Sequence, residues 1–203
     1  MNEDYLTRDL KRAFPGGPGD LRRLHALLAT AAERDGILDV AYRTVDGPVG
    51  PLLLAATDAG LVRVAYDSEG HDAVLQFLAD RISPRILSAP ARLDTPAREL
   101  DEYFAGRRRG FDLPLDWRLS AGFRRAVLSH LPEISYGHTA SYAAVARLAG
   151  NPKAFRAAAT ACATNPLPVV VPCHRVVYSD GRISRYLGGP DAKRTLLTLE
   201  ASD

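Results

Sequence analysis

The chain holds two cysteines, and one of them, Cys173, lies where its neighbours could make it a nucleophile. A thiol reacts as the thiolate, and a nearby histidine or arginine lowers the pKa of a thiol. His174 and Arg175 follow Cys173 directly, and three prolines and a run of valines stand within residues 165–172. Because proline restricts φ and valine favours extended backbone, we expect Cys173 at the end of a stiff, extended segment.

The rest of the composition limits what this thiol can do. The second cysteine, Cys162, reads as a small apolar residue on a helix, and two cysteines exclude a disulfide framework or a four-cysteine zinc site. The 203 residues are 46% hydrophobic and 25% charged, as in ordinary globular proteins, and no apolar run approaches the roughly 20 residues that cross a bilayer. The first residues are acidic and polar, unlike an export signal. We therefore expect a cytoplasmic protein without a membrane partner.

Positive charge gathers in the part of the chain that contains both cysteines. Residues 1–120 hold 16 Lys/Arg and 19 Asp/Glu, whereas residues 121–203 hold 10 and 5. This excess favours an anionic partner such as nucleic acid, although it also serves solubility.

The pattern of apolar residues predicts a sheet in the first half of the chain. Helical patterns at 5–14 and 20–34 are separated by a proline- and glycine-rich run, and in the second the leucines at 21, 24, 27 and 28 form one face that should dock. Extended segments follow at 38–42, 51–56 and 61–66, then helices at 71–82 and 95–103 and an edge strand at 111–115. A small antiparallel sheet with helices is the result.

After residue 120 the pattern is helical. A helix at 142–149, begun by Thr139 or Ser141, is followed by a Gly-Asn-Pro turn and a second helix at about 152–163. Two short helices joined by such a turn outline a helix-turn-helix. The second helix is rich in alanine, so it can approach another surface closely. The sequence is equally consistent with another helix and with DNA as that surface.

The residues around Cys173 are similar to a known family. The segment Pro172-Cys173-His174-Arg175-Val176 resembles the active-site motif of the O6-alkylguanine-DNA alkyltransferases, also called methylated-DNA–protein-cysteine methyltransferases. Other motifs stand in that family's order: Tyr136-Gly137, Ser141-Tyr142, Ala149-Gly150-Asn151-Pro152, Arg156, Asn165-Pro166, Ser179-Asp180-Gly181, Tyr186, Gly188-Gly189, Lys193, Leu196-Leu197 and Glu200. The resemblance is strong over residues 120–200 and looser over 45–66 and 100–115.

The resemblance implies an α+β fold in two domains. A small antiparallel-sheet domain, ribonuclease H-like in this family, is expected at 37–118, and a helical, winged-helix-like catalytic domain with the helix-turn-helix at 119–203. Residues 1–36 would be a helical extension of unknown role.

The family's activity implies DNA repair by direct, irreversible transfer of an alkyl group to the protein's own cysteine. Double-stranded DNA carrying O6-alkylguanine would be the partner, with O4-alkylthymine as a further candidate lesion, and the nucleotide would be flipped through the minor groove. Neither a metal nor an organic cofactor is implied. The protein would act once per molecule, as a monomer or in cooperative assemblies along DNA.

Individual roles follow from the same resemblance. Cys173 would be the nucleophile, His174 its base through a water, and Glu200 the group that orients the imidazole; Asn165 would be a hinge, and Tyr142 would offer its hydroxyl to the flipped guanine. Arg156 would fill the vacated stack. Further DNA contacts are expected from Ser141, Asn151, Lys153, Ala157 and Ala158, and the substrate pocket from Val176, Ser184, Tyr186 and Leu187.

Each role has a structural alternative. Tyr142 could be a core aromatic, Glu200 the last turn of an exposed helix, and Asn165 a helix terminator, while Arg175 reads as a structural anchor. The chain also departs from the family, which commonly places a glycine shortly before Tyr186, where this sequence has Ser184-Arg185. The added bulk of Ser184 predicts discrimination against large O6 substituents.

Two other functions compete with alkyl transfer. Non-catalytic lesion-binding proteins resemble this family but lack the nucleophile, so the presence of Cys173 argues against that function. A Cys-His hydrolase of another fold is disfavoured, because no glycine turn that could form an oxyanion hole follows the cysteine.

Overall fold

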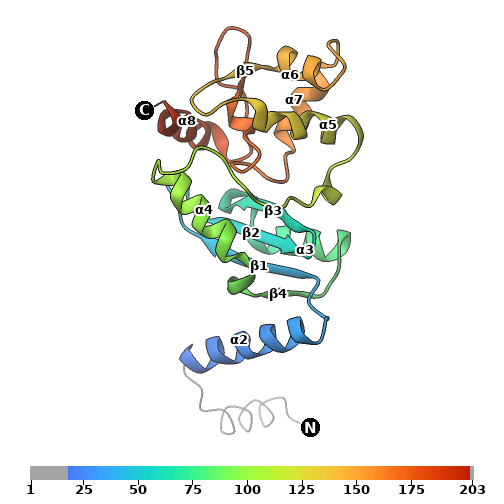
Figure 1. The fold of residues 1–203 in the computed structure, drawn as a ribbon, viewed down its shortest axis with the longest axis vertical. Coiled ribbons are helices and arrows are strands. Elements are labelled where there is room, and N and C mark those ends of the chain that lie inside the picture. Colours follow the sequence, from blue (N-terminus) through green and yellow to red (C-terminus); the bar gives the residue numbers. More distant parts are fainter. Residues whose placement is uncertain (1–17, 202–203) are drawn as a thin grey trace, which may run out of the picture.

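Three strands predicted from the sequence form the antiparallel part of a four-stranded sheet in the computed structural model, which describes residues 18–201. Strands β1 (Val40–Val45), β2 (Leu52–Thr57) and β3 (Gly60–Tyr66) pair in the order β3-β2-β1, and a fourth strand, β4 (Ile86–Ser88), lies parallel to β1 (Figure 1). The α+β fold class is confirmed, but the sheet is mixed. With only three residues, β4 is too short to show an alternating pattern.

Both faces of the sheet are covered, which explains why every residue of β2 is buried. Side chains alternate along a strand, so Leu52 and Leu54 enter one core cluster while Leu53 enters another. The second cluster is closed by helix α3 (His71–Arg81) through Val74 and Leu78. Helix α4 (Asp94–Phe104) packs on the first cluster.

The segment 111–115 is not the edge strand that we expected. It makes one isolated parallel bridge, Leu61 to Leu115, and the carbonyl of Pro114 accepts a hydrogen bond from the Leu61 amide at 2.8 Å. The Asp116 amide donates back to the Leu61 carbonyl at 2.8 Å, and because proline has no amide hydrogen, Pro114 cannot extend the ladder towards residue 111.

Helix α2 (Pro18–Arg34) docks through a different face from the one predicted. Leu24, Leu27 and Leu28 are 50%, 56% and 53% exposed, whereas Ala29 and Ala32 are buried. Alanine lets a helix lie close to its neighbour, here β4, whereas periodicity alone favours the larger residues. The side chain of Leu21 and the predicted helix at 5–14 lie outside the described residues.

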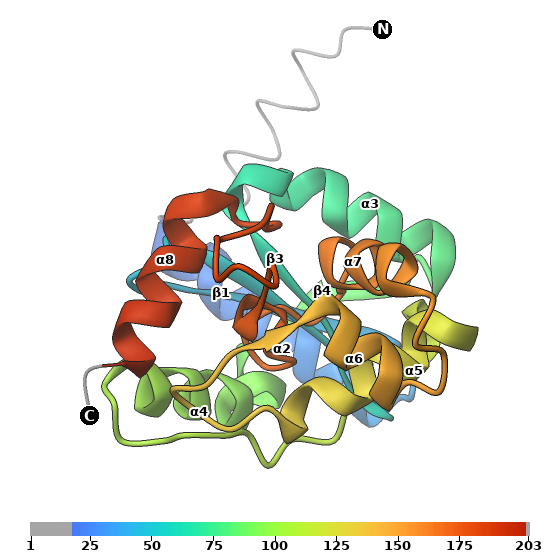
Figure 2. The ribbon, with the colours of Figure 1, turned by 90° about the horizontal axis from the view of Figure 1, so that it is seen from above.

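The C-terminal half consists of helices packed above the sheet (Figures 1 and 2). Helices α5 (Gly122–His130), α6 (Tyr142–Leu148) and α7 (Phe155–Ala163) contact one another, whereas α8 (Gly189–Glu200) lies on the other side of this half and contacts the 3-10 helix Cys173–Arg175. The two-residue strands β5 (Ala140–Ser141) and β6 (Val176–Val177) pair in parallel. No helix within residues 18–201 has the length and apolar character needed to span a bilayer.

Helices α6 and α7 form the predicted helix-turn-helix, with one change. The Ser141 hydroxyl caps α6 by accepting from the Ala144 amide at 3.2 Å. Helix α7 begins at Phe155, later than expected, because the Ala154 amide donates to the Asn151 carbonyl at 3.0 Å and closes a turn over residues 151–154. The turn sets the angle at which α7 leaves α6.

One hydrophobic cluster joins the sheet to the helices above it. It contains Leu61 and Tyr66 from β3, Tyr103 from α4, and Leu128 and Cys173 from the C-terminal half. Cys173 therefore lies inside the core that the two halves share.

The approach of β3 to residue 114 needs a glycine at its start, which gives a testable prediction. Gly60 has φ +130°, and an added Cβ would lie 2.1 Å from the Pro114 carbonyl oxygen. We expect Gly60→Ala to lower the free energy of unfolding by about 3 kcal/mol, measured by urea denaturation. Gly50→Ala is the matched control, because Gly50 also has positive φ (+87°) but open space around it, and should lose about 1 kcal/mol. Equal losses would show that the close approach is unimportant.

Candidate active site around Cys173

Cys173 is held by tight turns and not by the extended segment that we predicted. It begins a 3-10 helix, Cys173–Arg175, and is 1% exposed. Upstream, the Val171 amide donates to the Leu167 carbonyl at 2.8 Å, and Val169 has φ 72°. A left-handed valine costs about 1–3 kcal/mol, so surrounding contacts must impose this conformation. The prolines and valines do stiffen the segment, but as a turn.

The side chain of Asn165 contacts the sulfur directly. Its Nδ2 donates to the Val171 carbonyl at 2.8 Å and to Cys173 Sγ at 3.1 Å, while Oδ1 accepts from the Leu167 amide at 3.0 Å. Asn165 is completely buried. It thus connects the end of α7 to the turn before Cys173 and supplies a hydrogen bond that favours a thiolate.

The thiol is protonated in the resting protein. Burial raises the pKa of Cys173 to about 11, although the Asn165 hydrogen bond and the positive charge of Lys193 act in the opposite direction. A base must therefore remove the proton when the sulfur reacts.

The imidazole of His174 has one ring nitrogen that carries no proton. Its Nε2 lies 2.8 Å from Glu200 Oε1, and Nδ1 has no hydrogen-bond partner among the described residues. A carboxylate only accepts hydrogen bonds, so Nε2 carries the proton and Nδ1 is left as an acceptor. Burial lowers the pKa of His174, and the hydrogen bond to Glu200 opposes this. The resting imidazole is neutral.

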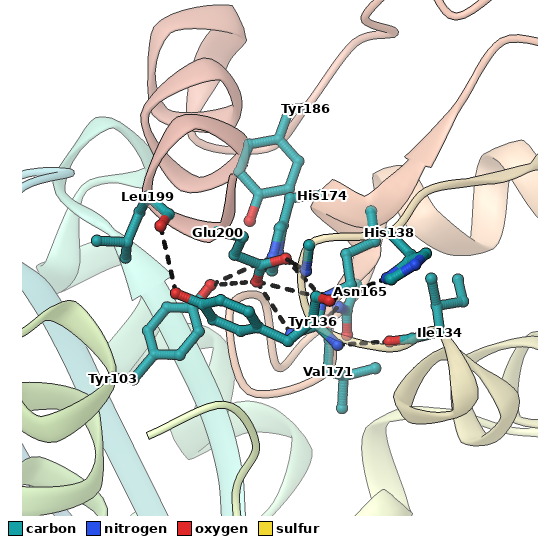
Figure 3. A network of polar contacts seen from close by, with 12 residues as sticks. Tyr103, Ile134, Tyr136, His138, Asn165, Val171, His174, Tyr186, Leu199 and Glu200 are labelled. Carbon is teal, nitrogen blue, oxygen red and sulfur yellow. Dashed lines mark hydrogen bonds and ion pairs between the residues drawn. The ribbon is translucent and has the colours of Figure 1, made fainter. Parts of the chain in front are cut away.

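The carboxylate of Glu200 gathers donors from several parts of the chain (Figure 3). Besides His174, it accepts from Arg175 Nε at 2.9 Å, from the Tyr103 hydroxyl at 2.6 Å and from the Gly137 amide at 3.3 Å. Glu200 is 3% exposed, which excludes the alternative of an exposed last turn. Burial alone would raise its pKa, but the hydrogen bonds from His174 and Arg175 outweigh this and lower the pKa to about 2.

Arg175 has the contacts of an anchor. In addition to Glu200, it donates from Nη1 to the Ile134 carbonyl at 2.6 Å, and its guanidinium lies 5.8 Å from the centre of the Tyr136 ring. Arg175 therefore compensates the charge of Glu200 and connects the segment at Ile134, which follows α5, to the site.

A second set of polar contacts surrounds Ser184. The Tyr142 hydroxyl contacts Ser184 Oγ, and Lys193 Nζ donates to Ser184 Oγ at 2.8 Å and to the Val176 carbonyl at 2.5 Å. Tyr142, Ser184 and Val176, three residues predicted to contact the substrate, are thus brought together in the buried interior. Tyr186 and Leu187 are half-buried, and the Tyr186 hydroxyl accepts from Tyr66 at 2.9 Å.

Three of these residues had no predicted role: Tyr66, Tyr103 and Lys193. The two tyrosines belong to β3 and α4, far from Cys173 in sequence, and no local spacing signals their contacts with Tyr186 and Glu200. Lys193 was part of the family-like pattern. The available signal was its helical spacing from Leu196 and Glu200, three and seven residues later, which places it on the buried face of α8.

The surface predicted to bind DNA is only partly exposed. Asn151, Lys153, Arg156 and Ala157 are exposed, and the Arg156 guanidinium lies 5.7 Å from the centre of the Phe155 ring. Ala158 is completely buried, and its helix neighbours Ala161 and Cys162 are also buried, because these positions share one face of α7. Ala158 packs in the core and cannot contact DNA, and Ser141 is half-buried as the cap of α6.

Comparison with known protein families identifies the family to which this chain belongs. The model of the 6-O-methylguanine DNA methyltransferase DNA-binding domain matches residues 122–202, and that of the ribonuclease-like domain of the same enzymes matches residues 40–117. A methylated-DNA–protein-cysteine methyltransferase of Methanosarcina barkeri is 36% identical over 162 residues, which are 80% of this chain and 98% of the relative. The chain belongs to the methylated-DNA–protein-cysteine methyltransferase family.

Solved structures agree with this membership. The O6-methylguanine methyltransferase of Mycobacterium tuberculosis aligns with a TM-score of 0.71 at 36% identity, over 80% of this chain and 93% of that one. The OGT of the same organism in complex with DNA aligns with a TM-score of 0.69. In this methyltransferase, the Glu200 site lies where the two matched regions meet, since Tyr103 belongs to one and Glu200 to the other.

The low pKa of Glu200 predicts how stability changes with pH. A carboxylate whose pKa falls from 4.5 to about 2 on folding contributes about 3 kcal/mol. This contribution is complete above pH 4.5 and disappears as the pH falls towards 2. We expect Glu200→Gln to lower the free energy of unfolding by several kcal/mol at pH 6, and the deficit relative to wild type to shrink towards pH 2. Urea denaturation across this range measures it. Asp72→Asn, at an exposed carboxylate, should parallel wild type, and a constant deficit for Glu200→Gln would contradict the assignment.

Proposed function

We propose that this protein repairs DNA by transferring the alkyl group of O6-alkylguanine irreversibly to Cys173. The observation that carries the proposal is the arrangement around the sulfur. A buried thiol receives the Asn165 hydrogen bond and lies beside a histidine whose tautomer is set by Glu200. The names of the relatives, and the M. tuberculosis complex with DNA, support the substrate class.

The first step is removal of the thiol proton. His174 Nδ1 accepts it, and because no hydrogen bond joins the two side chains directly, a water carries the proton between them. The imidazolium that forms is stabilised by Glu200, whose own charge is shared with Arg175. The Asn165 amide stabilises the thiolate.

The second step is a single displacement at the alkyl carbon. The sulfur–carbon bond forms as the carbon–O6 bond breaks, and the electron pair passes to the purine. A hydrogen bond or proton from the Tyr142 hydroxyl relieves that charge. A thioether is a poor leaving group, so each molecule reacts once. The protein supplies the nucleophile through Cys173, and no step of the transfer uses a cofactor.

The buried sulfur requires the base to leave the duplex. Cys173 is 1% exposed, so a stacked guanine cannot reach it. Flipping costs a few kcal/mol, which protein–DNA contacts must offset. We infer that α7 enters the minor groove together with the turn before it, which exposes Asn151 and Lys153, and that Arg156 occupies the space that the base vacates. O4-alkylthymine is a further candidate lesion for the same pocket.

Intact mass spectrometry tests the proposal against its alternatives. After incubation with duplex DNA containing O6-methylguanine, we expect the protein to gain one methyl group, located on Cys173 by peptide mapping. Cys173→Ala should gain none, whereas Cys162→Ala should react normally. Tight binding without a mass change would indicate a lesion-binding protein, and turnover of another substrate a hydrolase.

Arg156 should matter only when a base must be flipped. We expect Arg156→Ala to slow methyl transfer from duplex DNA about 10- to 100-fold, since flipping costs a few kcal/mol, and to leave the reaction with free O6-benzylguanine unchanged. Rapid-quench kinetics with both substrates measure this. Arg194→Ala removes an exposed charge on α8 and serves as the control. A loss of reaction with the free base in Arg156→Ala would contradict the role.

A further inference from the structure

Lys193 is a buried cation without a carboxylate partner. The residue is completely buried, and Nζ donates to the Val176 carbonyl and to Ser184 Oγ, with the Tyr186 ring centre 5.9 Å away. No ion pair joins it to any described residue, whereas Arg175, the other buried cation near Cys173, is paired with Glu200. A buried ion destabilises the fold unless its charge is compensated. The packing of α8 alone does not explain this cost, whereas a chemical role for the ammonium group would.

A line of hydrogen bonds connects Lys193 to Tyr142 through Ser184, and the ammonium sets its direction. An ammonium group only donates, so Ser184 Oγ accepts from Lys193 at 2.8 Å. The Ser184 hydroxyl hydrogen is then free to point to Tyr142, which is much closer than its other acceptor, the Val176 carbonyl at 3.5 Å. Once the Tyr142 oxygen accepts this hydrogen, its own hydrogen is directed onward, away from Ser184.

We propose that Lys193, Ser184 and Tyr142 form a proton relay that protonates the purine as it leaves. The inference rests on the proposed alkyl transfer and names the source of the proton. As the carbon–O6 bond breaks, the Tyr142 proton passes to the purine, the Ser184 proton to Tyr142, and a Lys193 proton to Ser184. Lys193 becomes a neutral amine and the purine leaves uncharged.

The relay keeps the charge of the buried site constant. Before reaction, Lys193 is positive, and Cys173 and His174 are neutral. After reaction, the thiol proton is on His174, the sulfur is a neutral thioether and Lys193 is neutral. One positive charge has moved from Lys193 to His174, which lies beside Glu200, so no proton need enter from solvent while the site is closed.

The surroundings of Lys193 favour release of its proton. Burial lowers the pKa of Lys193, and the facing titratable groups that act in the opposite direction are Cys173 and Cys162. Cys162 is a buried thiol whose pKa burial raises, so it stays neutral, and Cys173 loses its negative charge on alkylation. Burial also raises the pKa of Tyr142, so this hydroxyl gives up a proton readily only if another replaces it.

Two alkyl donors separate the relay from activation of the thiol. Guanine needs a proton to leave, whereas iodide leaves methyl iodide without one. We expect Ser184→Ala to slow methyl transfer from O6-methylguanine DNA about 100-fold, as for loss of a general acid, and to change the rate of Cys173 methylation by methyl iodide less than twofold. Ser184→Thr keeps the hydroxyl and should retain most of the transfer rate.

A double substitution tests whether the two hydroxyls act as one unit. Tyr142→Phe should slow transfer strongly in the wild-type background and only slightly in the Ser184→Ala background. Thermal unfolding of each variant confirms that it is folded. Full transfer by Ser184→Ala, or an equal loss with both methyl donors, would overturn the relay. Failure of the wild-type protein to accept a methyl group from DNA would instead overturn the proposed function.

Discussion

The buried carboxylate of Glu200 is the interaction on which the site depends. It accepts hydrogen bonds from α4, from the turn at Gly137 and from the 3-10 helix after Cys173, and so joins three separate parts of the chain. A buried carboxylate that loses one partner retains an uncompensated charge, which costs several kcal/mol. The same contacts therefore stabilise the fold and set the tautomer of His174.

Burial gives the sulfur of Cys173 two properties that suit the single, irreversible transfer that we propose. It keeps Cys173 protonated, because a thiolate is disfavoured away from water, and it leaves only 1% of the residue exposed to reagents in solution. The thiol is activated only when a base removes its proton, and Asn165 and Lys193 lower the cost of that step. The site is thus prepared to form a thiolate without maintaining one.

Local patterns in the sequence were sufficient where the outcome depends on neighbours along the chain. Strands β1 to β3, helices α3 and α4 and the helix-turn-helix follow from short apolar runs, helical period and turn residues. The patterns were insufficient for β4 and for residues 111–115, whose pairing depends on distant backbone, and for α2, whose buried face depends on the space beside β4. Ala158 was misplaced because the face that α7 buries is decided by α5 and α6.

By itself, the sequence determined the chemistry available: one cysteine followed by histidine and arginine, a distant glutamate, and a family-like order of motifs. The tertiary structure alone decided which groups act on one another. Asn165 contacts the sulfur, Tyr103 contacts Glu200 from the other half of the chain, and Lys193 is buried without a counter-charge. The physical reason is that hydrogen bonds and desolvation depend on distances of a few ångströms between residues, and folding sets these distances for residues far apart in sequence.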